Sequence, residues 1–216
     1  MINGINSREM ILEILLEIEE GEHSHVAIRN ALSKYQFLPK QDRAFITRVC
    51  EGTLEYRIQI DYIINSFSKV TVDKMKPAIR EILRSAVYQL KYMDSVPDSA
   101  VCNEAVKLAQ RKGFYNLKPF VNGVLRTIAR EMDQVRFPQK EDDLLKYLSV
   151  KYSMPEVLVT RWLEAYGEET TEKILADFIM EHPLTIRCRT YLNSKEEVIK
   201  SLESQGVHVA PAPYLP

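Results

Sequence analysis

Three residue types are scarce in this 216-residue sequence, which has only seven glycines, three cysteines and one tryptophan. Cys50, Cys102 and Cys188 are odd in number, lie far apart and include no Cys-x-x-Cys pair. This pattern excludes a disulfide framework and a cysteine-rich zinc site, and it predicts reduced thiols in a cytoplasmic protein without a bound metal. All three cysteines fall at apolar positions of expected helices or strands. We therefore expect small buried residues rather than catalytic nucleophiles.

The sequence also lacks long apolar runs and a targeting segment. No stretch reaches the roughly 20 apolar residues that a membrane-spanning helix needs. The N-terminal region is acidic and amphipathic, which excludes a signal or transit peptide. With 45% hydrophobic and 27% charged residues, the chain has enough apolar material for a buried core. The formal net charge of −1 excludes a protein that is basic overall, so any contact with nucleic acid must use a local patch.

Apolar residues recur at three- and four-residue steps through most of the chain, which predicts an all-α bundle over residues 1–138. The expected helices cover residues 7–20, 24–35, 40–67 with a break, 76–93, 98–110 and 117–130. Asn6 with Glu9 predicts a capping box for the first of them. Asp98 or Ser99, and Asn116, are the caps expected for the last two.

Two further segments follow the bundle. Residues 139–182 begin acidic and predict a small helical linker subdomain of three short helices. From Leu184 to Cys188, apolar and polar residues alternate, which predicts a strand. A helix over 194–205 and a second strand over 207–209 would make residues 183–216 the beginning of an α+β subdomain of the ferredoxin or RRM type. Two strands cannot close such a sheet, so we expect the chain to stop inside a domain.

Positive charge is concentrated in residues 107–130, which hold six cations and no acidic residue. Asn122, Arg126 and Arg130 are four residues apart, so a helix would point them to one side, opposite an apolar stripe. Concentrated positive charge on a rigid face suits a polyanion such as RNA. An ordinary solvated helix face would show the same pattern, and charge alone leaves both interpretations open. Gly123 lies inside this helix, where glycine is unfavourable, and we expect it to allow a neighbouring helix, rather than RNA backbone, to approach closely.

Three blocks of sequence, at 41–56, 83–110 and 118–130, resemble the NusB-type RNA-binding fold. The third block carries the phrase from Phe120 to Leu125, FVNGVL. The resemblance implies an all-helical domain of the kind used by bacterial antitermination factors and by a branch of rRNA methyltransferases. Arg126 stands where antitermination factors commonly have an acidic residue, and the chain continues well past this helix. Residues 151–194 are similar to the segment that precedes the catalytic domain in bacterial 16S rRNA cytosine-C5 methyltransferases.

The resemblance implies RNA binding by a set of cationic and amide side chains. The candidate RNA-binding residues are Arg8, Lys107, Arg111, Lys112, Lys118, Asn122, Arg126 and Arg130. The expected partner is small-subunit ribosomal RNA, with a ribosomal protein as a further candidate and no DNA. The resemblance also implies a parent enzyme that uses S-adenosylmethionine and a catalytic cysteine. The sequence has neither a Gly-rich strand-to-helix turn nor a Pro-Cys pair, so we expect no catalytic or cofactor-binding residue in this chain and no activity by itself.

Two other functions remain open from the sequence. A NusB-like bundle with apolar grooves would also suit a protein-interaction module that binds a ribosomal protein without RNA. A complete antitermination factor is the third interpretation, and the long continuation beyond residue 140 counts against it.

Overall fold

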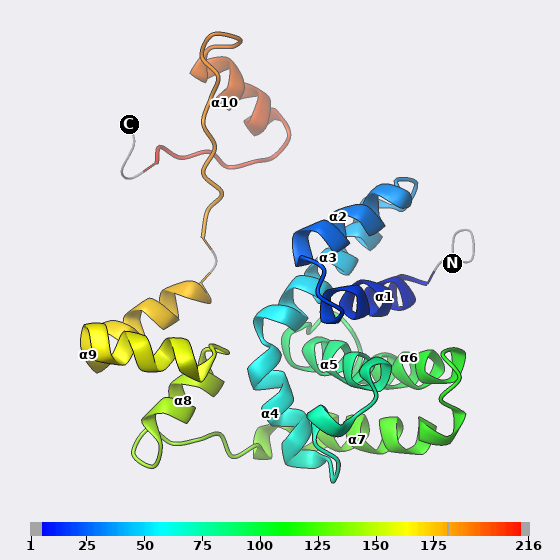
Figure 1. Ribbon diagram of the computed structural model, residues 1–216. Coiled ribbons are helices and arrows are strands. Elements are labelled where there is room, and N and C mark those ends of the chain that lie inside the picture. Colours follow the sequence, from blue (N-terminus) through cyan, green and yellow to red (C-terminus); the bar gives the residue numbers. More distant parts are fainter. Residues whose placement is uncertain (1–5, 181, 213–216) are drawn as a thin grey trace. The chain divides into compact units, whose positions relative to one another are not determined.

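A computed structural model describes residues 6–180 and 182–212, and α-helices dominate that part of the chain (Figure 1). The chain divides into two compact units between Phe178 and Ile179. Within the described ranges, no helix has the length and apolar character that a membrane crossing requires.

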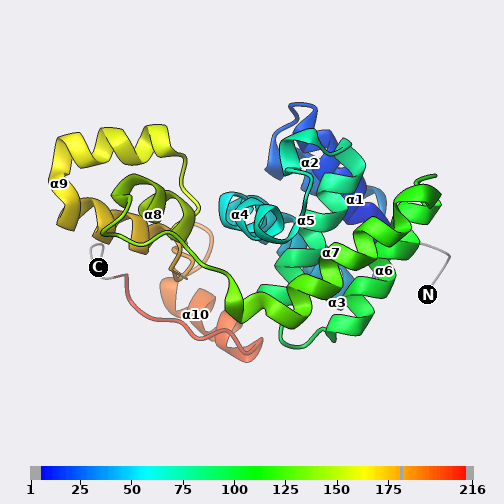
Figure 2. The same ribbon diagram turned by 90° about the horizontal axis from the view of Figure 1, so that it is seen from below.

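Seven helices build the bundle in the first unit. They are α1 (Ser7–Glu19), α2 (Ser24–Lys34), α3 (Lys40–Glu55), α4 (Arg57–Phe67), α5 (Pro77–Tyr92), α6 (Asp98–Arg111) and α7 (Lys118–Glu131). Short 3₁₀ turns occur at η1 (Val72–Lys74), η2 (Tyr115–Leu117) and η3 (Met132–Gln134). Helix α5 contacts α1, α3, α4, α6 and α7, and its buried apolar residues sit at the centre of one hydrophobic core. Figures 1 and 2 both show α6 and α7 side by side, in agreement with their extensive contacts.

The helix caps agree with the sequence only in part. Asn6 Oδ1 accepts hydrogen bonds from the backbone N–H groups of Arg8 (2.9 Å) and Glu9 (3.3 Å), so Asn6 caps α1 as expected, although the Glu9 side chain does not complete the predicted capping box. The other two predicted caps are wrong. Pro97 precedes α6 and Leu117 precedes α7, and neither helix has a side-chain cap. The physical reason is that the chain enters α6 directly from a proline and enters α7 through the turn η2, which contains the residue expected to cap it.

The two glycines inside bundle helices have opposite surroundings. Gly52 of α3 is buried against α5, where a Cβ atom would overlap the ring of Tyr88. Gly123 of α7 is exposed, and a Cβ atom there would meet nothing within 4 Å. The prediction that Gly123 allows close helix packing is therefore wrong. That role belongs to Gly52, because α3 and α5 approach each other directly over its missing side chain.

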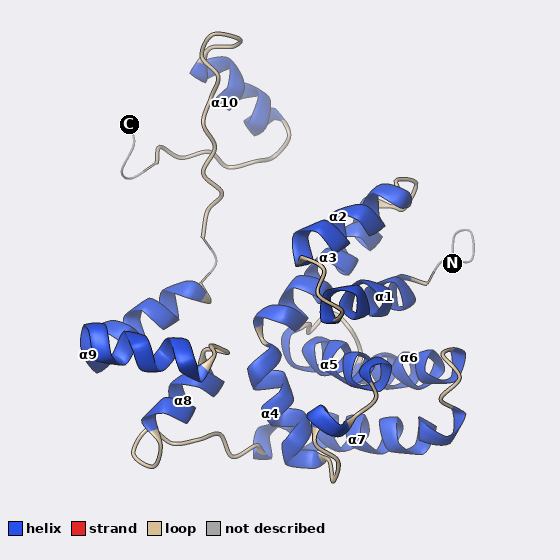
Figure 3. Cartoon of the chain, in the orientation of Figure 1, coloured by secondary structure: helices blue, strands red, loops and turns tan. Residues whose placement is uncertain are grey.

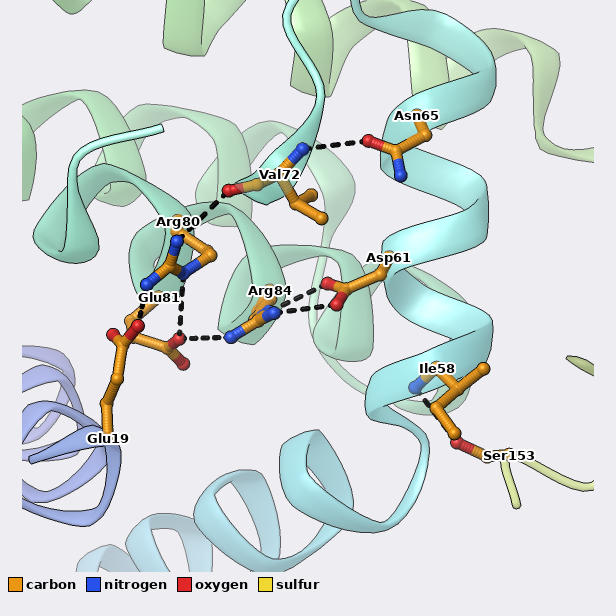
Figure 4. A network of polar contacts seen from close by, with 9 residues as sticks. All are labelled: Glu19, Ile58, Asp61, Asn65, Val72, Arg80, Glu81, Arg84 and Ser153. Atoms are coloured by element: carbon orange, nitrogen blue, oxygen red, sulfur yellow. Dashed lines mark hydrogen bonds and ion pairs between the residues drawn. The ribbon is translucent and has the colours of Figure 1, made fainter. Parts of the chain in front are cut away.

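A network of charged side chains ties α1, α4 and α5 together (Figure 4). The guanidinium of Arg84 donates two hydrogen bonds to Asp61, of 2.7 and 2.6 Å, and one of 2.6 Å to Glu81. Arg80 forms an ion pair with Glu19 and donates to the carbonyl of Val72 at 3.2 Å. Burial raises the pKa of Glu81, and the two arginines oppose that shift. This network fixes the relative positions of three helices at their polar edge.

Helices α8 (Leu144–Lys151) and α9 (Glu156–Phe178) pack together, and α8 packs onto α4. The Gln59 side chain of α4 donates to the carbonyls of Val150 (3.1 Å) and Lys151 (3.2 Å). The Ile58 N–H donates to Ser153 Oγ at 3.1 Å, a contact visible in Figure 4. Helix α9 bends sharply at Gly167, whose φ of 73° lies in the left-handed region where glycine is favoured. The bend confirms the two separate helices expected on either side of this glycine.

Glu172 of α9 receives hydrogen bonds from several donors. Its carboxylate accepts from Lys151 Nζ (3.0 Å), Tyr152 Oη (3.1 Å) and Lys140 Nζ (3.1 Å). The hydrogen bond from Lys151, helped by those from Lys140 and Tyr152, lowers the pKa of Glu172 to about 2 against the opposing effect of burial. The carboxylate therefore stabilises the packing of α8 against α9 while it is ionised.

We expect Glu172→Gln to lower the free energy of unfolding by about 1 kcal/mol at pH 6, because the site is partly exposed. A folded-state pKa below the unfolded one gives stability that is present above about pH 4.5 and lost as the pH falls toward 2. The difference in free energy of unfolding between wild type and variant should therefore disappear over this pH range in denaturant titrations at several pH values. Glu164→Gln, at an exposed site on α9, is the control. A gap of the same size at pH 6 and pH 2 would contradict this account.

The second unit contains α10 (Lys195–Ser204) within loop segments. Ser194 caps this helix with the full capping box, in which Ser194 Oγ accepts from the Glu197 N–H (3.2 Å) and the Glu197 carboxylate accepts from the Ser194 N–H (2.9 Å). The strands expected at 184–188 and 207–209 are not present, and Figure 3 shows no strand in the described residues. An alternating segment becomes a strand only when a neighbour completes its backbone hydrogen bonds, and no such ladder forms along these two segments.

Candidate nucleic-acid interface

Helix α7 has an apolar side and a polar side, as its sequence predicts. Its buried residues are Val121, Val124, Leu125 and Ile128, which face the bundle. Its polar stripe consists of Lys118, Asn122, Arg126 and Arg130, each four residues after the last, so that the helix places them along one face. We call these four residues the α7 stripe.

Arg126 and Asn122 form one unit within the α7 stripe. Arg126 Nε donates to Asn122 Oδ1 at 2.9 Å, and the Arg126 side chain is exposed. Because a guanidinium can only donate, the amide oxygen must face Arg126, which leaves the Asn122 amide N–H groups available as donors. Among the described residues, neither Arg126 nor Lys118 has an acidic partner within ion-pair distance. Their charge is therefore available to a ligand.

Arg130 ends the α7 stripe with a pair that is mainly solvent-exposed. Its Nη2 lies 2.6 Å from the Glu131 carboxylate, and 71% of the arginine side chain is exposed. Exposed ion pairs contribute little free energy, so a phosphate group can replace Glu131 as a partner at small cost.

The cations before α7 have acidic partners, on α6 itself or on α1. Lys107 lies 2.8 Å from Glu104, and Arg111 lies 3.9 Å from Glu9. Lys112 lies 3.4 Å from Glu9 and 3.0 Å from Glu13 (this second acid is also on α1). Burial alone would lower the pKa of Lys112, but the hydrogen bonds and charges of Glu13 and Glu9 together outweigh that effect and raise it. The segment that is free of acids in the sequence is therefore partly neutralised in space at the end of α6.

Arg8 lies apart from the α7 stripe and is held within the bundle. Its Nε donates to Gln89 Oε1 at 3.2 Å, and its guanidinium carbon lies 5.2 Å from the centre of the Phe45 ring. Burial lowers the pKa of Arg8, against the opposing effect of Glu104. The structure thus gives Arg8 a packing role between helices, and its contact with RNA stays a prediction.

The cysteines in the bundle lack the surroundings of a nucleophile. Cys50 and Cys102 are buried, as expected, and burial raises the pKa of both thiols. A nucleophilic cysteine needs the opposite shift, toward a thiolate at neutral pH. Cys188 is partly exposed in the segment that precedes α10, so the expectation of a buried residue is wrong there, because the strand that would have held it against a core does not form.

One surface feature was not predicted from the sequence. Between α4 and the loop after η3, the structure has an open hollow of about 590 Å³. Tyr62 and Phe137 line it, with ring centres 5.8 Å apart, together with charged residues of both signs: Arg136, Lys146, Asp142 and Asp143. The run Arg-Phe-Pro after α7 is the only sequence signal for it. Tyr62, whose hydroxyl donates to the Arg136 carbonyl, lies 74 residues earlier in the chain than Arg136.

Two protein-family models match successive parts of the chain. A model described as the NusB family matches residues 5–130, and one described as the ferredoxin-like domain of RsmF/B-like methyltransferases matches residues 154–216. The chain is 32% identical over 202 residues to the probable ribosomal RNA small subunit methyltransferase B of Bacillus subtilis (strain 168). The match covers 94% of this chain and 44% of that protein, so the chain spans less than half the length of the curated relative.

Two solved structures resemble the fold. The crystal structure of PH0851 matches with a TM-score of 0.68 at 23% identity, over 99% of this chain and 48% of that one. The crystal structure of the antitermination factors NusB and NusE in complex with dsRNA matches with a TM-score of 0.53 at 21% identity, over 57% of this chain and 93% of that one.

Proposed function

Because this chain belongs to the NusB family, which its residues 5–130 match, we propose that its helical bundle binds RNA through the α7 stripe. The observation that supports this most directly is Arg126. It is exposed, has no acidic partner among the described residues, and lies beside a second donor, Asn122. Phosphate oxygens are acceptors, and arginine is well suited to bind them.

Small-subunit ribosomal RNA is the RNA class that we propose. The support is the similarity to ribosomal RNA small subunit methyltransferase B over 94% of this chain. In this proposal the bundle fixes the position of the RNA through contacts with its backbone, which carry little sequence information. A catalytic domain then meets its target base in a defined register.

For the parent protein we propose methyl transfer from S-adenosylmethionine to cytosine C5. These residues do not fit a methyl-donor site, because the sequence has no Gly-rich turn between a strand and a helix. The thiols of Cys50 and Cys102 do not fit the nucleophile either, since burial raises the pKa of both. We therefore assign this chain a binding role without catalysis of its own.

A second candidate function is binding of a protein partner, as in the complex of NusB and NusE with dsRNA. A ribosomal protein is the partner class that we propose for it. If the chain binds such a protein and does not bind RNA, this candidate replaces the first.

The test is a titration of the whole chain with small-subunit rRNA fragments at two salt concentrations. We expect wild-type affinity to fall steeply with salt, because each phosphate contact releases counterions. Reversal of two charges in Arg126→Glu/Arg130→Glu should lower the affinity at least tenfold. It should also reduce the slope of the logarithm of the binding constant against the logarithm of the salt concentration by about 1.5.

A matched control changes the same number of charges on another helix. Arg29→Glu/Lys34→Glu alters two exposed cations of α2 and should leave RNA affinity within about threefold of wild type, since those residues lie outside the stripe. Equal losses in the two double variants would show that overall charge, rather than the α7 stripe, drives binding.

A further inference from the structure

The protein itself gives no reason for a glycine at position 123. Gly123 lies in the interior of α7, where glycine weakens a helix relative to alanine. It is exposed, its φ is not in the left-handed region, and a Cβ atom would meet nothing within 4 Å. Neither packing nor backbone conformation in the described part of the chain requires it. Gly52, by contrast, is explained fully by the ring of Tyr88.

The side chains around Gly123 offer hydrogen-bond donors to a ligand. Arg126 follows it by three residues, which makes the two neighbours on the helix surface, and Asn122 is joined to Arg126 by a hydrogen bond. Asn122 Oδ1 is occupied by Arg126 Nε at 2.9 Å. The Asn122 amide N–H groups and the remaining guanidinium N–H groups are therefore left to donate. A group rich in acceptors and negative charge is the ligand chemistry that fits this surface.

We propose that the sugar–phosphate backbone of bound RNA crosses α7 directly over Gly123, within van der Waals contact of the helix. The absent side chain leaves room for the strand, while Asn122 and Arg126 donate to phosphate oxygens beside it. This inference rests on the RNA-binding function proposed above and adds the point of closest approach. Because the surroundings of Gly123 are cationic and rich in donors, we favour RNA as the ligand at this position over a protein helix whose surface is apolar or poor in acidic residues.

The experiment uses Gly123→Ala and Gly123→Leu in the whole chain, with the same rRNA fragments. Alanine should raise the midpoint temperature of thermal unfolding by about 2 to 4 °C, because it is the better helix former. It should also weaken RNA binding about threefold, and leucine should weaken it at least tenfold. The slope of affinity against salt should stay at the wild-type value, because no charge is removed.

Ala44→Leu is the matched control, since Ala44 is exposed on α3 and gains similar apolar bulk away from the stripe. Its RNA affinity should equal that of wild type. Wild-type affinity in Gly123→Leu, together with the loss expected in Arg126→Glu/Arg130→Glu, would overturn this inference and leave the proposed function intact. Absence of salt-dependent RNA binding by the wild type would instead overturn the proposed function.

Discussion

Arg84→Met is expected to lower the free energy of unfolding by about 3 to 5 kcal/mol, one of the largest effects of any single change in the bundle. The Arg84 side chain is only 11% exposed, and it donates to both Asp61 and Glu81. Methionine keeps much of the volume and removes all three hydrogen bonds. It leaves Glu81, whose side chain is 4% exposed, with Arg80 Nε at 4.0 Å as its nearest cation. A buried carboxylate without a close partner is the costly product of this substitution.

The pH dependence of the free energy of unfolding provides a specific test of this prediction. The pKa of Glu81 is already raised by burial, and Arg84 opposes that shift. Loss of Arg84 must therefore raise the pKa of Glu81 further. A carboxyl group with a raised folded-state pKa contributes stability that is present below its unfolded pKa and is lost as the pH rises through the folded value. The deficit of Arg84→Met should accordingly shrink when unfolding is measured at pH 4 instead of pH 7.

A double variant distinguishes the loss of the Arg84–Glu81 ion pair from the cost of leaving the Glu81 carboxylate buried without a partner. Arg84→Met/Glu81→Gln removes the ion pair without leaving a buried charge, so we expect it to be more stable than Arg84→Met alone. Asp61, with a side chain that is 22% exposed, can turn to water in both variants. Strict additivity of the two single changes in equilibrium denaturant titrations would argue against coupling between Arg84 and Glu81.

The sequence predicted local features of the fold better than contacts between distant residues. The faces of α7 follow from the helical period alone, so both its apolar side and the alignment of Asn122, Arg126 and Arg130 on another side were predicted correctly. The capping residue Asn6 was recognised from neighbouring positions. In contrast, Gln89 is 81 residues from Arg8 in sequence, and no local pattern indicates that these side chains meet. The same limit applies to Lys112, whose partner Glu13 is 99 residues away.

The electrostatics of the candidate site also depend on contacts between residues that are distant in the sequence. Residues 107–130 contain no acid, and this suggested one continuous basic surface. Folding brings Glu9 and Glu13 of α1 to the end of α6, so the free positive charge is concentrated on α7. The network of Arg80 and Arg84 was missed because charged residues in an amphipathic helix are normally expected on its solvated face. Its one sequence signal is the close spacing of the charged residues at 80, 81 and 84.

Gly52→Ala is expected to lower the free energy of unfolding by about 2 kcal/mol, although alanine is the better helix former. The gain in helix propensity is about 1 kcal/mol. This gain is outweighed by the overlap of the new methyl group with the ring of Tyr88, because such overpacking costs about 3 kcal/mol. The ring cannot move aside easily, since Tyr88 is 6% exposed and lies near Tyr56 and Tyr92, with ring centres 6.5 and 5.3 Å away. Denaturant titration of wild type and variant measures this loss.

The same substitution at the chain's other helical bundle glycine provides the control. Gly123→Ala should raise the free energy of unfolding, because nothing surrounds its added methyl group. Truncation of the Tyr88 side chain provides the converse test. In a cycle with Tyr88→Ala, the double variant should be more stable than the sum of the single changes predicts, because the truncated side chain leaves room for the Gly52→Ala methyl group. If Gly52→Ala were stabilising, α3 and α5 could not approach each other as closely as this structure places them. The packing on which α7 and its stripe rest would then need a different description.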